Sequence, residues 1–237
     1  TQIFPAGNIQ VPLNFGNQTF LSLGFMGGPV QQKFDPEKMT FNDQFVNGSY
    51  SVTNPTSQVF NRTNLTYVDL AAGMSLSGLM GEQAKYYFGI GGFHLNSPKV
   101  AFMKQNDVKL NRKYVVNMGL YAPVGNNNNF IIYADYFMQG NYNLAQGGFL
   151  YNYNLGGGGE EYNNTSITSG IFYRWADALV PVLKLDKDKL GIGMSYDINI
   201  SKLKTASETR GGFEVTLSYK NLISLRHPDP TSCPVVF

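Results

Sequence analysis

The sequence predicts an all-β chain that folds as an antiparallel transmembrane β-barrel. Three observations support this prediction. Apolar and small polar residues alternate with period 2 in about ten segments of the 237-residue chain. Most of these segments are about ten residues long, the length of a tilted strand that crosses a bilayer. Charged residues make up 14% of the chain, against about 25% in an average soluble domain, and they gather between the segments.

The alternation begins near the N-terminus and recurs to residue 220. In residues 67–77, Val68, Leu70 and Met74 alternate with Asp69 and with small residues. Successive side chains of a strand point to opposite faces, so each strand has one apolar face and one small, polar face. The predicted strands are residues 19–27, 67–77, 86–91, 113–120, 130–138, 144–153, 165–175, 179–186, 190–201 and 212–220.

The later strands follow the same rule. Residues 113–120 and 130–138 flank the turn-rich segment PVGNNNN, which predicts a hairpin. Residues 190–201 read LGIGMSYDINIS, where large apolar residues alternate with glycine, serine, Asp197 and Asn199. In residues 212–220, Phe213 and Val215 alternate with Glu214. No segment combines a 3.6-residue apolar period with helix-capping signals, so no amphipathic helix is predicted.

The polar face favours a membrane barrel over a soluble β-sandwich. The outer face of a sandwich meets water and carries many long charged side chains, whereas here it carries glycine, serine, asparagine and aspartate. Those residues suit a wet barrel lumen, while the apolar residues face lipid and aromatic residues near strand ends form interfacial girdles. A charge facing lipid at mid-depth would cost about 2–4 kcal/mol. The residues expected to face the lumen in a structural role are Asp69, Asp135, Arg174, Asp197, Asn199 and Glu214.

The charge, the sequence motifs and the loop lengths exclude several classes of function and predict a topology. The net charge of +2 comes from scattered basic residues, which argues against nucleic acid as a partner. No apolar run is long enough for a transmembrane helix, the first residues lack signal-peptide features, and no cofactor or metal motif is found. The single cysteine, Cys233, cannot form an internal disulfide. Long and short connections alternate at first, so residues 1–220 are predicted as the barrel and residues 221–237 as a periplasmic tail.

The sequence gives little support for an enzyme. The two histidines are His94 and His227, and only His94 lies at a strand end where a barrel lipase could use it. A hydrogen-bonded structural role explains His94 more simply. The glycine run at residues 156–159 lacks the lysine and helix of a phosphate loop. We therefore expect a protein that is not an enzyme.

Four segments carry a resemblance to a known family. They are residues 33–45 (KFDPEKMTFNDQF), 86–102 (YYFGIGGFHLNSPKVAF), 171–181 (IFYRWADALVP) and 190–219, and in this order they resemble the PorP/SprF family. The resemblance implies an outer-membrane barrel accessory of type IX secretion and the associated gliding machinery. It also implies partners: a periplasmic ring lipoprotein of the translocon, or the C-terminal signal domain of a secreted adhesin.

The resemblance also bears on strand number and on the site. Family members normally begin with a signal peptide and further N-terminal strands, so the whole barrel is expected to have about twelve to fourteen strands. Recognition residues usually lie on loops held by a rigid scaffold. The candidate partner-binding or family-signature residues are Phe34, Asp35, Asp43, Gln44, Phe45, His94, Leu95, Asn96 and Pro98.

Three alternatives remain open on the sequence alone. A diffusion porin or a hydrophobic-ligand transporter has the same strand pattern, and an open, conducting pore would identify it. A soluble β-sandwich binding module would stay in the aqueous phase without detergent. A barrel hydrolase would lose its activity when His94 is replaced by alanine.

Overall fold

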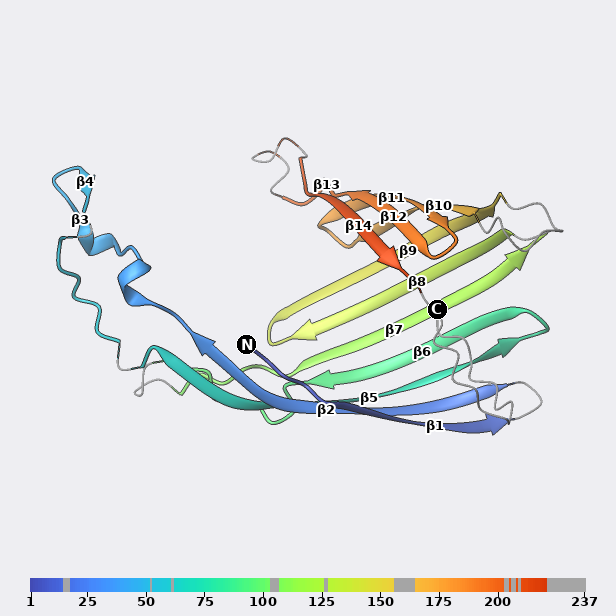
Figure 1. Ribbon diagram of the computed structural model, residues 1–237, viewed down its shortest axis with the longest axis horizontal. Helices are drawn as coiled ribbons and strands as arrows, with labels where there is room; N and C mark the ends of the chain where they lie inside the picture. The colour runs from blue at the N-terminus through green and yellow to red at the C-terminus, as the bar shows by residue number, and fades with distance from the viewer. Residues whose placement is uncertain are drawn as a thin grey trace. The chain divides into compact units, whose positions relative to one another are not determined.

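The described part of the chain is mostly β-structure with very little helix, which confirms the predicted all-β class. The computed structural model describes residues 1–14, 18–51, 53–60, 62–102, 107–125, 128–155, 165–202, 205, 208 and 210–220 (Figure 1). Cys233, His227, the glycine run and the predicted tail lie outside these residues. The strands are β1 (Ala6–Asn14), β2 (Thr19–Lys33), β3 (Phe45–Val46), β4 (Ser49–Tyr50), β5 (Asn64–Met80), β6 (Ala84–Phe93), β7 (Lys113–Val124), β8 (Asn128–Gln139), β9 (Tyr142–Asn154), β10 (Thr165–Arg174), β11 (Ala178–Lys187), β12 (Leu190–Tyr196), β13 (Ile198–Asn199) and β14 (Phe213–Tyr219).

One sheet contains all strands except the small β3–β4 hairpin. Its hydrogen-bonded order is β1-β2-β5-β6-β7-β8-β9-β10-β11-β12-β14, and β13 pairs with β11. The pairs β8–β9, β9–β10, β10–β11, β11–β12 and β12–β14 are antiparallel. Sheet neighbours follow one another in the chain, as in an up-and-down barrel wall. Among the described residues the order starts at β1 and ends at β14, so the sheet is open there.

The chain divides into two compact units. The first contains residues 1–8, 24–72 and 92–113, with the two short 3₁₀ helices η1 (Pro36–Lys38) and η2 (Asn42–Gln44). The second contains residues 9–23, 73–91 and 114–237, so it includes most of β7 and all of β8 to β14. In the second unit the arrows of β7 and β8 point in opposite directions (Figure 1). No helix in the described part of the chain is long and apolar enough to cross a membrane.

Side-chain exposure follows the predicted alternation. On β5, Val68 and Leu70 are exposed to 55% and 46%, whereas Asp69 between them is exposed to only 8%. On β12, Leu190, Ile192 and Met194 are exposed, while the two glycines between them are buried. We call the side of the strands with the exposed apolar residues the apolar face and the opposite side the polar face. The usual rule for a water-soluble protein is thus reversed, as a lipid-facing wall requires.

The structure contains a long strand that was not predicted, besides the short β3 and β4, and one predicted strand is interrupted. Residues 6–14 form β1, where Ile9, Val11 and Leu13 alternate with polar residues and Pro12. A proline cannot donate to a neighbouring strand, which is tolerated at the sheet edge that β1 occupies. The predicted strand 190–201 is interrupted at Asp197, which lies between β12 and β13, although its N–H still donates to the Gly212 carbonyl.

Close strand packing makes one glycine sensitive to substitution. A Cβ atom on Gly170 would overlap the Phe149 carbonyl oxygen of the neighbouring strand β9. We expect Gly170→Ala to lower the free energy of unfolding by about 1–3 kcal/mol, because the backbone must shift. Gly147→Ala is the control, since its Cβ would lie 3.6 Å from the nearest neighbouring atom, the Tyr133 carbonyl oxygen. Urea unfolding in detergent measures the free energy of unfolding of both variants. Equal losses in Gly170→Ala and Gly147→Ala would contradict the prediction.

Candidate functional site

The long connection between β2 and β5, residues 34–63, carries its own folded structure in the first unit. We call it the excursion. It contains η1, η2 and the β3–β4 hairpin, in which Phe45 pairs with Tyr50 and Val46 with Ser49. The hairpin turns at Asn47 and Gly48, whose φ angles of 55° and 78° are both left-handed. Asn-Gly favours this two-residue turn because both residues tolerate positive φ.

Gln44 holds the hairpin to the rest of the excursion. Its side chain accepts a hydrogen bond from the Phe41 N–H at 3.1 Å and donates one to the Asn54 carbonyl at 3.0 Å. The Asn54 side chain in turn donates to the Gln44 carbonyl at 3.0 Å. Gln44 is only 7% exposed, so it cannot be a surface contact for a partner. It instead positions Phe45, the next residue.

A cluster of phenylalanines forms the base of the excursion. The Phe34 ring meets Phe60 edge-on at a centroid distance of 5.0 Å and Phe102 at 4.9 Å. Phe41 lies 5.7 Å from Phe60. Edge-to-face pairs of this kind add about 0.5–1.5 kcal/mol beyond the burial of their area. Phe34 thus joins the excursion to the loop after β6, and Asp35 beside it caps η1 by accepting from the Glu37 N–H.

Asp43 binds the second half of the excursion. Its carboxylate accepts hydrogen bonds from the Ser57 N–H at 2.7 Å, the Ser57 hydroxyl at 2.8 Å and the Thr56 hydroxyl at 3.0 Å. These bonds favour the charged form, so the Ser57 N–H above all holds the pKa of Asp43 below its usual value. Asp43 therefore links η2 to residues 56 and 57 of the same excursion through hydrogen bonds.

The lowered pKa of Asp43 predicts a pH-dependent contribution to stability. The carboxylate stabilises the excursion at neutral pH, and this contribution is lost as the pH falls below the usual carboxyl range towards the lowered pKa. We expect Asp43→Asn to lower the thermal midpoint at pH 7, with a difference from wild type that shrinks below about pH 4. Thermal melts followed by circular dichroism at pH 7 and below about pH 4 test this. A difference in thermal midpoint between variant and wild type that grows on acidification would contradict the prediction.

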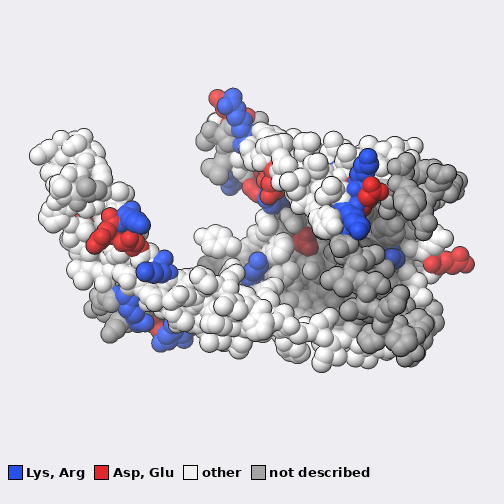
Figure 2. Space-filling model, viewed as in Figure 1, with Lys and Arg blue, Asp and Glu red and all other residues white. Residues whose placement is uncertain are grey.

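The end of the excursion exposes apolar side chains. Phe45 is 60% exposed, Val46 47% and Tyr50 39%. We call these three residues the hairpin tip. Residues 44–60 contain no charged residue, and Figure 2 shows the charges of the excursion gathered away from the end that carries β3 and β4. An apolar cluster held by a scaffold of hydrogen bonds is typical of a protein-binding surface.

A second set of predicted site residues joins β5 to the turn after β6. Nδ1 of His94 lies 2.7 Å from Oδ2 of Asp69, and the side chains are 23% and 11% exposed. Asn96 donates to the Val68 carbonyl at 2.7 Å and accepts from the Leu70 N–H at 3.3 Å. Leu95 contributes through its backbone: its N–H donates to the Leu70 carbonyl at 3.0 Å, and its carbonyl accepts from Nε of Arg112 at 3.0 Å. Pro98 is buried and its carbonyl accepts from the Leu110 N–H.

The other polar-face residues lie in the second unit. Gln146 donates to Asp135 at 3.1 Å, across the β8–β9 pair. Arg174 contacts Asp197 through Nη2, and its Nε lies 2.7 Å from the carboxylate of Asp177. The Asn199 side chain accepts hydrogen bonds from the N–H and the hydroxyl of Ser201. Glu214 of β14 lies opposite Ser195 of β12. Within the described ranges, no three metal-binding side chains come together as a candidate metal site.

Comparison with known families decides the identity. The sequence model described as type IX secretion system membrane protein PorP/SprF matches residues 8–219. The chain belongs to the PorP/SprF family. No curated protein and no solved structure matches the chain.

As a PorP/SprF protein, the chain is a membrane component of type IX secretion and acts with other components of that system. The site residues predicted from the sequence fall into two groups, one exposed and one engaged in contacts within the chain. Phe45 is exposed at the hairpin tip, whereas Phe34, Asp43, Gln44 and His94 make internal contacts.

Val46 and Tyr50 were missed by the sequence analysis. The Asn47-Gly48 pair between two short apolar segments was the signal that could have identified them.

Proposed function

We propose that this chain is a non-enzymatic outer-membrane β-barrel of the type IX secretion and gliding machinery, and that its excursion binds a secreted protein. The observation that carries the proposal is the exposed hairpin tip, which is uncharged, apolar and held in place by Gln44. Family membership supports a role in secretion. The apolar face, exposed along β5 and β12, supports a location within a bilayer.

The position of the excursion favours one of the two partner classes. Long loops of bacterial barrels are extracellular and short turns are periplasmic. The excursion spans thirty residues, whereas β5 and β6 are joined at the opposite strand ends by the short segment 81–83. Under that rule the hairpin tip would meet exported cargo, such as the C-terminal signal domain of an adhesin. A periplasmic ring lipoprotein would bind at the other strand ends.

Affinity purification in mild detergent tests the proposal. We expect secreted cargo to co-purify with the wild-type chain, and recovery to fall at least about tenfold for the double variant Phe45→Ser, Val46→Ser, because apolar residues at the centre of an interface carry much of the affinity. Val108→Ser is the matched control, since Val108 is 53% exposed in the other loop of the same unit. Recovery of the barrel alone, or equal loss in both variants, would contradict the proposal. High single-channel conductance in planar bilayers would favour a porin instead.

A further inference from the structure

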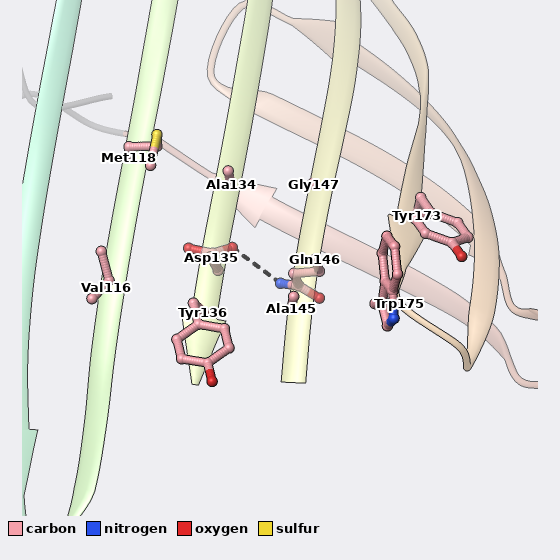
Figure 3. Close-up of a pocket in the computed structure, with 10 residues that line it drawn as sticks. All are labelled: Val116, Met118, Ala134, Asp135, Tyr136, Ala145, Gln146, Gly147, Tyr173 and Trp175. Atoms are coloured by element: carbon pink, nitrogen blue, oxygen red, sulfur yellow. Dashed lines mark hydrogen bonds between the residues drawn. The ribbon is translucent and has the colours of Figure 1, made fainter. Parts of the chain in front are cut away.

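A shallow apolar pocket lies on the apolar face of the second unit. Val116 and Met118 of β7 line one side, and Tyr173 and Trp175 line the other (Figure 3). Met118 is 48% exposed and Trp175 70%. Each lies on the same strand parity as the other exposed apolar residues, so the pocket opens towards the surroundings of the sheet and away from the polar face.

Small residues on two neighbouring strands create the pocket. The register places Ala134 of β8 opposite Gly147 of β9, and Tyr136 opposite Ala145. Gly147 also faces Tyr173 on β10. Three small residues therefore stand side by side on a face otherwise covered by large apolar side chains. The space above them is bounded by Met118 and the rings of Tyr136 and Tyr173 (Figure 3).

Two polar residues, Asp135 and Gln146, also line the pocket (Figure 3). They alternate along β8 and β9 with the small residues, so their side chains point towards the opposite face, where they bond to each other. Tyr136 stands three residues before the end of β8, and Trp175 directly follows β10. Both aromatic residues thus lie at the same strand ends, near the turn that joins β8 to β9. Tyrosine and tryptophan favour the level of lipid headgroups, since each ring has an apolar body and a polar edge.

We propose that this pocket binds one acyl chain of a bilayer phospholipid, with the headgroup at the end marked by Tyr136 and Trp175. The inference rests on the proposed membrane location of the chain. An empty hollow in a lipid-facing wall forfeits dispersion contacts along its lining. A linear, flexible hydrocarbon chain can fill a shallow apolar trough, and the bilayer supplies such chains at very high local concentration. No charged side chain on the apolar face of β8 or β9 opposes this occupant.

Photolabelling in vesicles tests the proposal. The full chain is reconstituted in phosphatidylethanolamine and phosphatidylglycerol vesicles that contain a trace of phosphatidylethanolamine with a diazirine in one acyl chain. We expect peptides around Met118 and Ala145 to be labelled several-fold more than peptides around Ile167 and Leu183, which are also exposed on the apolar face. The variant Gly147→Leu should remove this enrichment. A Cβ on Gly147 has room, because its nearest neighbouring atom would be 3.6 Å away.

Two further variants make the test specific. Ala145→Leu fills the pocket from a second position, so the result does not depend on Gly147 alone. Ser169→Leu adds the same side chain to the exposed, apolar parity of β10 outside the pocket and should leave the enrichment unchanged. Each variant is first shown to be folded by its heat-modified migration on a gel.

The outcomes separate this inference from the proposed function. Enrichment lost in both pocket-filling variants and kept in Ser169→Leu supports the acyl-chain site. Even labelling along the apolar face, or a pocket occupied by a co-purified protein, overturns the site and leaves the membrane location intact. Absence of lipid labelling anywhere on the apolar face would overturn both the site and the barrel.

Discussion

Replacing Gln44 with alanine is expected to abolish partner capture through loss of order in the excursion. The substitution leaves the Phe41 N–H and the Asn54 carbonyl, both bonded to the Gln44 side chain, without that partner. Each unsatisfied, partly buried group costs about 1–3 kcal/mol. A total of about 2–6 kcal/mol would raise the population of an opened excursion by roughly 30-fold or more. Trypsin cleavage after Lys38 at pH 7 and co-purification of cargo measure the two effects.

The same substitution at a neighbouring glutamine supplies the control. Gln58 is exposed. Its backbone N–H, and not its side chain, donates a hydrogen bond to the Thr56 hydroxyl. Gln58→Ala should leave both cleavage and capture near wild type. If Gln44→Ala binds cargo normally although its excursion is cleaved faster, an ordered excursion is not required and the hairpin tip is not the binding surface.

Replacing His94 with alanine is expected to lower the free energy of unfolding by about 2–3 kcal/mol, because it leaves a buried carboxylate without its partner. Asp69 is 8% exposed, and in the described part of the chain its second carboxylate oxygen, Oδ1, already has no hydrogen-bond partner. His94 is also one of few non-glycine residues with positive φ, at 56°, so its place in the turn is specific. Urea unfolding of the detergent-solubilised protein measures the loss.

A double-mutant cycle isolates the contact between the two side chains. Asp69→Ala alone and the double variant are compared with His94→Ala under identical conditions. The double variant should lose less than the sum of the two single losses, by about 1 kcal/mol or more, since both singles break the same contact. Additive losses would show that Asp69 and His94 do not stabilise the fold through each other.

The strands could be predicted because alternation is a local property of the sequence. Val68 and Leu70 are exposed and Asp69 is buried, as period 2 in residues 67–77 predicts. The prediction that this apolar side meets lipid rests on the small number of ions on the polar face. The strand at residues 6–14 was missed although it also alternates, since Pro12 suggests a loop when its position at the sheet edge is unknown.

The candidate site was only partly predictable, because its contacts join residues far apart in the chain. Gln44 was selected as a family-signature residue, yet its role depends on Asn54, ten residues away. His94 was expected to be a structural residue at a strand end, but sequence spacing does not show that Asp69, twenty-five residues earlier, is its partner. Asp197 alternates as predicted, whereas the interruption between β12 and β13 at this residue was not predicted from the alternation.

The open ends of the large sheet restrict how a ring could form. Eleven strands lie in the hydrogen-bonded path from β1 to β14 in chain order. When neighbours alternate in direction, the first and the eleventh strand run the same way. Direct closure would therefore create one parallel seam in an otherwise antiparallel wall. An antiparallel ring would need an odd number of further strands between β14 and β1, and in a bilayer their backbone groups would pair with those of the two edge strands of the described sheet.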